Sequence, residues 1–451
     1  MTSMSLIDMA FLLVETDSSP KHVAGLQVFR KPSNADSDYL DRLYEIWLAS
    51  PVSPPFDQVP AYRLWLLPHW ESASNFNLAE HIFRHHLPAP GGKGQLTKLV
   101  GELHSARLRT DRPPWECHIL DGLAGGRFAV YFKIHHAYGD GLKIGDWLGR
   151  PLSRRKREFP KFAYWQTPDG AVPEVQVGPL GMLWQQLAAV PGISAMGLRQ
   201  GLKWLGVARN GSAPPFSAPR TVLNARLGPS RGVALLRFPL PRLRNIAQLH
   251  ACTVNDVVLT LCGRALTAYL ARRGHLPAQS LVAEVPVSLR SDSEQGSEGN
   301  RVTLALVTLA GQQADPIAQM LEVHRACNDA KAEVHGISKT AMKGYTTLLA
   351  GSVLVAEAVG LGMSIPPLGN VLISNVPGDP HRHYMGSAAL LEAYPVSTLM
   401  PSVALNITVY SYAGSLFVGV VCDRDVVHDL ARLAALMRKA YRELVSAADP
   451  V

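Results

Sequence analysis

The chain has 451 residues, more than one hydrophobic core usually holds, so its length predicts two domains. Apolar residues make up 47% and charged residues 18% of it, which excludes an intrinsically disordered protein. The formal net charge of +8 favours an anionic partner such as nucleic acid, anionic lipid or a phosphorylated substrate. Nucleic acid is the least favoured, because the chain has no recognition motif and no basic stripe with interleaved aromatic residues.

Residues 1–150 are predicted to form the first domain. Period-2 alternation and helical spacing predict these elements in order: a strand at His22–Phe29, a helix at Asp38–Ser50, a helix at Gln95–Leu108, and strands at Trp115–Leu123 and Arg127–His136 that meet in the Gly125-Gly126 turn. The pair His85-His86 runs into a segment rich in proline and glycine and is interpreted as a loop feature.

Residues 151–220 are predicted to be a long connector, because proline and glycine are frequent around one apolar helical pattern at Met182–Leu205. The connector carries the densest basic cluster, Arg154–Arg157 with Lys161. This cluster is either a solvated linker face or a contact for anionic lipid.

Residues 221–451 are predicted to form the second domain. The expected elements are strands at Val233–Pro239, Leu281–Leu289, Arg301–Leu309 and Asn370–Asn375, a hairpin of Leu405–Ser411 with Ser415–Val421, and helices at Leu240–His250, Val257–Leu270 (N-cap Thr253), Pro316–Val334, Ser338–Gly360 and Asp429–Ala447. Because helices and strands mix in both halves, the fold class is α/β.

The cysteines point to a reducing compartment. Five of them, Cys117, Cys252, Cys262, Cys327 and Cys422, are scattered and never form a CxxC pair, so we expect reduced, mostly buried thiols in a cytoplasmic protein and no structural zinc. Asp8 interrupts the first apolar run, which argues against a signal peptide. The apolar stretch Tyr345–Met363 contains Glu357 and is predicted to be a buried helix rather than a membrane span.

The most informative stretch is Phe128–Gly141. Its apolar residues alternate as in a strand, and extending that period puts His136 on the apolar face and His135 on the other. Gly139 and Gly141 flank Asp140 and permit a tight turn that returns the carboxylate to the strand end. Histidine suits proton transfer at neutral pH, although a pair of this kind is also compatible with core packing. A shared metal is disfavoured, because adjacent histidines on a strand point to opposite faces.

The run His135-His136-Ala137-Tyr138-Gly139-Asp140-Gly141 matches the HHxxxDG signature of CoA-dependent acyltransferases. Further blocks resemble the bacterial wax ester synthase/diacylglycerol acyltransferases: Ser5–Glu15, His22–Phe29, Arg112–His118, Val254–Leu259, Pro286–Arg290, Ser374–Gly378 and Ala404–Thr408. Because these blocks occur in order from end to end, the chain as a whole resembles that family.

The resemblance implies two chloramphenicol-acetyltransferase-like lobes with an active-site tunnel between them. It also implies transfer of a long-chain acyl group from acyl-CoA to a long-chain alcohol, and to diacylglycerol as a second acceptor, without a cofactor. We expect peripheral contact with a membrane or lipid inclusion. The alternatives are a relative that uses a smaller or polyketide-type alcohol or an amine, a lipid-surface protein without turnover, and a histidine-metal hydrolase.

His136 is the expected general base, and no covalent acyl-enzyme is required because a thiol with a pKa of about 8.5 leaves readily. Asp140, at the Gly141 turn, is expected to lock the loop, with Arg290 as a candidate partner, and His135 to support the loop or line the acyl side. Asn255 is either an oxyanion donor or merely part of a helix start.

Several further residues are candidates for the substrate channel. Ser374 and Asn375 end a buried strand, and they either line the tunnel or serve the following turn. Gly360, Gly362 and Met363 close an apolar helix, where they either leave room for an alkyl chain or form a C-cap.

Overall fold

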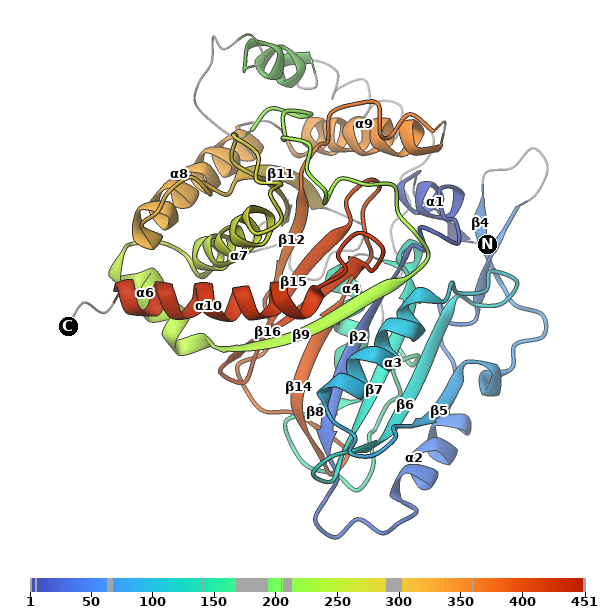
Figure 1. The fold of residues 1–451 in the computed structure, drawn as a ribbon. Coiled ribbons are helices and arrows are strands. Elements are labelled where there is room, and N and C mark those ends of the chain that lie inside the picture. The colour runs from blue at the N-terminus through green and yellow to red at the C-terminus, as the bar shows by residue number, and fades with distance from the viewer. Residues whose placement is uncertain are drawn as a thin grey trace.

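The computed structural model describes residues 2–4, 6–62, 68–139, 141–167, 194–203, 205, 213–288, 302–336, 338–358 and 360–448. Within them the chain forms two mixed α/β lobes, each built on one large sheet (Figure 1). The fold class predicted from the sequence is therefore confirmed.

The first lobe is built on a sheet with the strand order β5-β6-β7-β2-β14-β13-β8. Its elements are β2 (His22–Arg30), β5 (Ile82–His86), β6 (Trp115–Leu123), β7 (Arg127–His135), β8 (Leu152–Ser153), β13 (Tyr384–Met385), β14 (Ala388–Val396), α1 (Leu6–Leu13), α2 (Tyr39–Leu48), α3 (Lys93–Ser105) and α4 (Gly141–Gly149), with the short turns η1 (Leu78–Glu80) and η2 (His136–Tyr138). A small sheet of β1 (Thr2–Ser3), β4 (His69–Ser72) and β3 (Gln58–Ala61) lies beside it.

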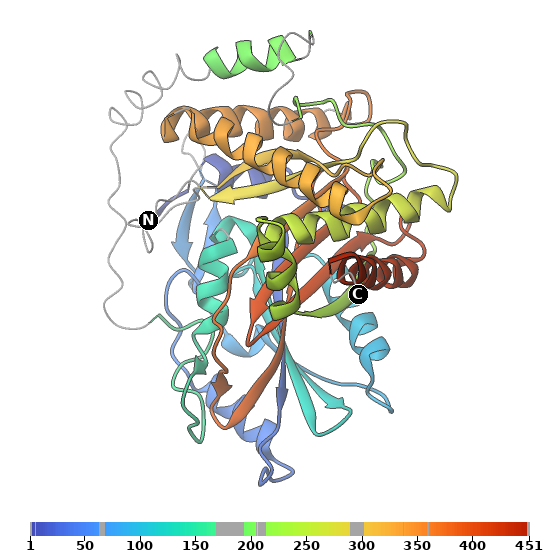
Figure 2. The ribbon, with the colours of Figure 1, turned by 90° about the vertical axis from the view of Figure 1, so that its left-hand side faces the viewer.

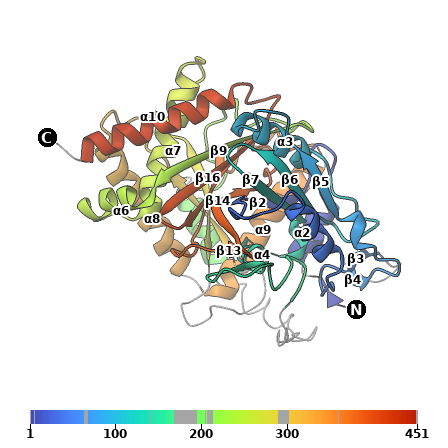
Figure 3. The same ribbon diagram turned by 90° about the horizontal axis from the view of Figure 1, so that it is seen from below.

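The second lobe is built on a sheet with the order β11-β10-β12-β15-β16-β9. Its elements are β9 (Arg231–Pro239), β10 (Val282–Ser288), β11 (Val302–Thr308), β12 (Val371–Val376), β15 (Leu405–Tyr412), β16 (Ser415–Asp423), α6 (Leu240–Leu249), α7 (Val254–Ala271), α8 (Pro316–His335), α9 (Lys339–Ala358) and α10 (Leu430–Ala448). The helices α6, α7, α8 and α10 gather on one side of this sheet and bury a common apolar core against it (Figure 3).

The two lobes are joined by strands as well as by the connector. β14, from the C-terminal half of the chain, pairs antiparallel with β2 of the first lobe. The core of the first lobe extends to Val233 and Leu235 on β9 and to Phe417 on β16. A shared apolar core of this kind holds the lobes together, because separating them would expose it to water.

Most elements predicted from the sequence are confirmed within a few residues. The strand pair β6–β7 pairs antiparallel across the Gly125-Gly126 turn, whose residues both have positive φ. Thr253 caps α7 in a capping box with Asp256, as the N-cap chemistry predicts. The prediction for His85-His86 was wrong, because these residues form the end of β5, which pairs parallel with β6.

The prediction of a buried helix over Tyr345–Met363 was also wrong in part. α9 covers Lys339–Ala358, and Leu348 and Val355 on it are 60% and 63% exposed. The helix is half-buried because only one side of it packs on β11 and its neighbours. Among the described helices, no single one is long and apolar enough to cross a membrane; α6 and α7 pass that test only as a pair bent by 101°.

Within the connector, residues 194–203 are helical, and this helix lies beside α9 in two views (Figures 1 and 2). Met196 packs there with Met342 of α9 and Val334 of α8. Glu333 on α8 binds Lys203 of the connector helix at 2.7 Å. The rest of the predicted pattern at Met182–Leu205 lies largely outside the described residues.

Candidate active site

The histidine pair lies where β7 ends. β7 stops at His135, which pairs with His22 of β2, and His136 begins the 3-10 turn η2. The expectation that His136 continues the strand alternation was therefore wrong, because the backbone leaves the extended conformation one residue earlier. The side chain of His136 is thus positioned by the turn and not by the pleat of the sheet.

His135 is completely buried. Its Nδ1 accepts a hydrogen bond of 3.1 Å from the backbone N–H of Ala137, inside η2. Because Nδ1 is the acceptor, the ring proton of a neutral imidazole lies on Nε2, which is 3.6 Å from Oε1 of Glu15. The His135 side chain therefore holds the turn that carries His136 and does not itself face solvent.

Glu15 is a fully buried carboxylate that follows α1. Its Oε1 accepts a hydrogen bond of 2.9 Å from the Lys21 backbone N–H, and Arg107 donates to Oε2 at 2.8 Å. Burial alone would raise the pKa of Glu15, but the interactions with His135, Lys21 and Arg107 outweigh it and lower the pKa to about 2. Glu15 is thus a fixed negative charge beside the histidine pair.

The ring of His136 is stacked on an aromatic side chain of α1. The centroids of Phe11 and His136 are 4.4 Å apart, with an angle of 21° between the planes. The backbone N–H of His136 donates to the carbonyl of Lys21 at 2.8 Å. His136 is half-buried whereas His135 has no exposed surface, so His136 is the member of the pair that a substrate can approach.

Lys21 links this site to the second lobe. Its ammonium donates to Ser19 Oγ at 2.6 Å, and burial lowers its pKa to about 8 against the opposing attraction of Glu357 on α9 and of Glu15. Glu357 in turn accepts a hydrogen bond of 3.1 Å from Ser402. The histidine pair therefore lies close to the end of α9, which packs on α1.

The residues after η2 are described only in part. Asp140 and its candidate partner Arg290 lie outside the described residues. Gly139 is extended, with a φ of 173°, and Gly141 begins α4. Tyr138 is buried, and its hydroxyl donates to the carbonyl of Gln58 at 2.5 Å.

Asn255 lies in the first turn of α7, which packs against α6, α8 and α10, whereas η2 packs against α1. Its role as an oxyanion donor stays a prediction. The helix-start interpretation agrees with this geometry, because the next residue, Asp256, closes the capping box.

The predicted substrate-channel residues divide into two groups. Gly360 has a φ of +77°, its N–H bonds the carbonyl of Glu357, and the N–H of Leu361 bonds that of Ala356, which is a Schellman cap of α9. Gly362 lies against Glu357, because a Cβ at this position would be 2.6 Å from its Oε2. Both glycines therefore lie against Glu357, whose charge acts on Lys21 beside the histidine pair.

The second group is more exposed. The Sδ of Met363 is 3.9 Å from Nη1 of Arg220, and its side chain is 40% exposed. Ser374 is half-buried and Asn375 is exposed near the end of β12, which pairs parallel with β15. Contact of these residues with substrate stays a prediction.

Sequence reasoning missed the residues that surround the histidine pair: the buried Glu15 and Lys21, the half-buried Phe11, and Glu357, whose charge acts on Lys21. Phe11 and Glu15 belong to the Ser5–Glu15 block, so the signal was present in the block but its spatial link to His135 was not. Trp115, by contrast, is core: it is buried and its indole N–H donates to the carbonyl of Phe56 at 2.8 Å.

Comparison with known proteins decides the family. Residues 4–258 match the wax ester synthase/diacylglycerol acyltransferase catalytic domain, and residues 298–445 match the WS/DGAT C-terminal domain. The chain belongs to the wax ester synthase/diacylglycerol acyltransferase family. It is therefore an acyltransferase.

Individual relatives agree over the full length. A Mycobacterium tuberculosis chain named as a candidate diacylglycerol O-acyltransferase, Rv3740c, is 34% identical over 98% of this chain and 99% of its own. The solved wax ester synthase/diacylglycerol acyltransferase from Marinobacter aquaeolei VT8 is 29% identical, covers 99% of this chain and 100% of that one, and superposes with a TM-score of 0.77.

A more distant structure shows the same fold. The first condensation domain of the calcium-dependent antibiotic synthetase is 18% identical, covers 100% of this chain and 97% of that one, and has a TM-score of 0.61. At this identity the likeness concerns the fold alone. It confirms the two-lobed architecture expected from the resemblance of this acyltransferase to the HHxxxDG enzymes.

Proposed function

We propose that the protein transfers a long-chain fatty acyl group from acyl-CoA to the hydroxyl of diacylglycerol or of a long-chain alcohol, with His136 as general base. The observation that carries the proposal is the arrangement of the histidine pair. His135 accepts from the Ala137 N–H and lies 3.6 Å from Glu15, and its half-buried neighbour His136 stacks on Phe11. Family membership and the names of the relatives support the acyl and acceptor classes.

In the proposed step, a ring nitrogen of the His136 imidazole takes the proton of the acceptor hydroxyl. The hydroxyl oxygen attacks the thioester carbonyl, an ester C–O bond forms and the C–S bond breaks. The imidazolium then returns the proton to the CoA thiolate, so that free CoA and the ester leave. The step needs no cofactor and no acyl-enzyme, because the thiolate is itself a good leaving group.

The surroundings of His136 suit this role. Glu15 is ionised at neutral pH because its pKa is about 2, so a negative charge near the pair favours the imidazolium that forms during the reaction. Phe11 fixes the plane of the ring by stacking. The proposed step does not include Asn255, because its helix α7 packs against α6, α8 and α10, whereas the turn of His136 packs against α1.

We also propose that the enzyme works at the cytoplasmic surface of a membrane or lipid inclusion, where its water-insoluble acceptors reside. Three exposed leucines support this: Leu198 of the connector helix at 68%, Leu205 after it at 77% and Leu348 of α9 at 60%. An exposed cluster of large apolar side chains is typical of a surface that contacts lipid. The free cysteines are consistent with a reducing compartment.

The basic cluster at Arg154–Arg157 is a competing lipid contact. It follows β8, in the lower part of Figure 1, whereas α9 lies in the upper part. Arg154 is also paired with Asp379 at 2.7 Å. We therefore favour the apolar surface around α9 as the lipid contact.

An acceptor panel tests the reaction. Purified enzyme is given palmitoyl-CoA with hexadecanol, dioleoylglycerol, a short-chain alcohol or an amine, and both free CoA and the acylated product are measured. We expect ester with hexadecanol or dioleoylglycerol and none with the amine. Free CoA released at the same rate without any acceptor would contradict the proposal.

Flotation with anionic vesicles tests the lipid surface. We expect Leu198→Asp combined with Leu348→Asp to reduce vesicle binding several-fold, because burying a charge in lipid is costly. Leu249→Asp is the matched control, since Leu249 is 57% exposed but ends α6. Loss of binding on charge reversal of Arg154–Arg157, with none in the leucine variant, would assign the contact to the basic cluster instead.

A further inference from the structure

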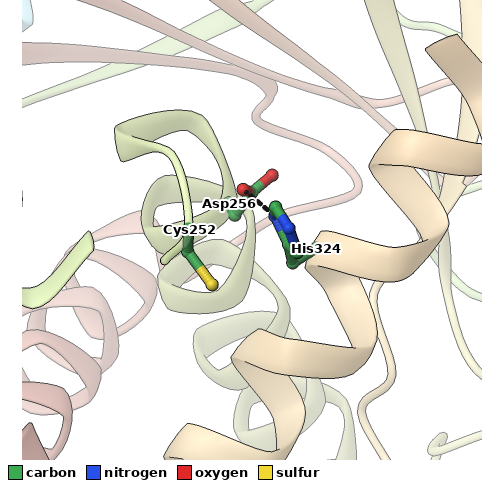
Figure 4. Close-up of side chains that lie close together, drawn as sticks. All are labelled: Cys252, Asp256 and His324. Atoms are coloured by element: carbon green, nitrogen blue, oxygen red, sulfur yellow. Dashed lines mark hydrogen bonds and ion pairs between the residues drawn. The ribbon is translucent and has the colours of Figure 1, made fainter. Parts of the chain in front are cut away.

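A second polar cluster lies in the other lobe, between the start of α7 and the middle of α8. Cys252 precedes α7, Asp256 lies in its first turn, and His324 projects from α8 toward both (Figure 4). One ligand atom from each of the three residues lies within 4.8 Å of the other two. Thiolate, carboxylate and imidazole are the donor types that proteins use for zinc.

Asp256 is the buried centre of the cluster. The residue has no exposed surface, and its Oδ2 accepts hydrogen bonds from the Thr253 N–H and hydroxyl, both at 2.8 Å, and from His324 Nδ1 at 2.7 Å. Its other oxygen, Oδ1, is buried and accepts no hydrogen bond of ordinary geometry from the described residues, although the Cys327 thiol lies close enough to the carboxylate to help lower the pKa of Asp256. A thiol is a weak donor, so a cation beside this buried carboxylate would stabilise it further.

The hydrogen bonds of His324 exclude a nucleophilic triad. In such a triad Nε2 faces the nucleophile while Nδ1 bonds the carboxylate. Here Nδ1 does bond Asp256, but Nε2 is 2.9 Å from Nδ2 of Asn328, so it does not serve Cys252. Metal binding at Nδ1 would place the ring proton on Nε2, so the Asn328 amide would then have to turn its oxygen toward that N–H to act as a second-shell acceptor.

The spacing of the residues also fits a metal site assembled from two elements. Cys252 and Asp256 are four residues apart, and Cys327, which is buried, is one turn beyond His324 on α8. Ligand atoms of a tetrahedral zinc site lie roughly 3.3–3.8 Å apart, given bonds of about 2.0–2.3 Å. The present spread is up to 4.8 Å, so metal binding would have to draw the Cys252 thiol inward from its hydrogen bond to the His250 carbonyl and replace the His324–Asp256 hydrogen bond.

We infer that Cys252, Asp256 and His324 form a structural site for a thiophilic divalent cation, best matched by Zn²⁺. The fourth position of the tetrahedron is open to water or to the Cys327 thiol. Binding ties the first turn of α7 to α8, and the ion displaces the thiol proton and the proton shared by His324 and Asp256. The site is separate from the histidine pair, so it holds whether or not the proposed acyl transfer is correct.

Metal analysis of the full-length protein tests the site. The protein is purified under a reducing agent from zinc-supplemented medium, and its metal content is measured; the metal is then removed and Co²⁺ is titrated as a spectroscopic probe. We expect about one zinc per chain, and a thiolate-to-cobalt charge-transfer band that Cys252→Ser abolishes. We expect His324→Ala to weaken cobalt binding at least tenfold, and zinc to raise Tm in the wild type but in neither variant.

His275→Ala is the matched control, because His275 is exposed near the end of the same helix α7 and is not part of the cluster. It should leave the metal content and the cobalt band unchanged. Circular dichroism confirms that each variant is folded before titration. A wild-type protein with only trace metal and no cobalt–thiolate band would overturn the inference, as would an unchanged band in Cys252→Ser.

Discussion

The same dipeptide, His-His, ends two strands of one sheet, and the two copies have different surroundings. At the end of β7, His135 is completely buried against Glu15 and His136 stacks on Phe11. At the end of β5, His85 is half-buried, with its Nε2 3.1 Å from Nδ1 of His118, and His86 is exposed. β5 is the edge strand, whereas β7 lies between β6 and β2.

The difference indicates that the residues packed around a His-His dipeptide, and not the dipeptide alone, determine whether it can form an active site. The β7 pair has a carboxylate with a lowered pKa, an aromatic ring and the end of α9 around it. The β5 pair has the His118 imidazole beside it, with the carboxylates of Glu116 and Asp121 acting on His85 and His86. Burial together with the charge of His118 lowers the pKa of His85, against the opposing attraction of Glu116. An imidazole becomes a useful base where the protein fixes both its plane and its electrostatic environment.

The largest expected effect separates the two pairs. His136→Ala should lower kcat/KM about 10²- to 10⁴-fold, because it removes the proposed general base. His86→Ala should leave kcat/KM within about twofold of the wild type, since an exposed side chain at a strand edge takes no part in the step. Ester formation from palmitoyl-CoA and dioleoylglycerol is the measurement, and equal losses in both variants would break the comparison.

The next effect concerns the charge beside the β7 pair. The pKa of Glu15 is about 2 in the folded protein against an ordinary value of 4.5, so this carboxylate adds stability above pH 4.5 that is lost as the pH falls toward 2. The full contribution is on the order of 3 kcal/mol. We therefore expect Glu15→Gln to be markedly less stable than the wild type at pH 7, and we expect the difference to fall to about 1.4 kcal/mol at pH 3, where the folded-state carboxyl is still mostly ionised.

Urea unfolding of both proteins between pH 3 and pH 7 measures this difference. Glu116, whose pKa is also about 2, is present in both proteins and cancels in the comparison. If the difference in unfolding free energy between wild type and Glu15→Gln does not change with pH, the carboxylate is not held by these contacts.

The sequence predicts features that arise from neighbouring residues better than contacts between residues far apart in the chain. The β6–β7 hairpin, the Thr253 cap and the α9 C-cap follow from local periodicity and turn chemistry, and they are confirmed. The pairing of β14 with β2 joins residues more than 350 positions apart. Hydrophobic alternation shows which face of a strand is buried, but it does not show which other strand it pairs with.

The same limit applies to the candidate sites. His135 and His136 are adjacent in the sequence and belong to one continuous motif, so they can be found without knowing the fold. Glu15 and Phe11 reach them only through the folding of α1 onto η2. The cluster of Cys252, Asp256 and His324 was missed altogether, because a mixed ligand set split between two helices has none of the spacing of CxxC motifs.

A smaller effect should follow from the ring under His136. Phe11→Leu keeps an apolar side chain but removes the stacked plane, so we expect kcat/KM to fall about tenfold with little change in stability, consistent with an aromatic contact of roughly 1 kcal/mol. Phe83, which stacks on His118 near the β5 pair, is the matched control. A loss as large for Phe83→Leu as for Phe11→Leu would show that general packing, and not the stack on His136, is being measured.

The smallest effect is expected inside the β5 pair. His85→Ala removes the hydrogen bond to His118 and should cost about 1 kcal/mol of stability. Its kcat/KM should stay within about twofold of the wild type. An activity loss above tenfold in a folded His85→Ala protein would require a role for the edge strand in the reaction.

The most direct test of the central claim lies within the β7 pair itself. His136→Asn and His135→Asn are compared for kcat/KM with palmitoyl-CoA and dioleoylglycerol, normalised to folded protein; the asparagine at 135 keeps an acceptor for the Ala137 N–H. We predict a loss of about 10³ for His136→Asn and of only about tenfold for His135→Asn. The reverse order, with His136→Asn active and His135→Asn inactive, would contradict the assignment of His136 as the base.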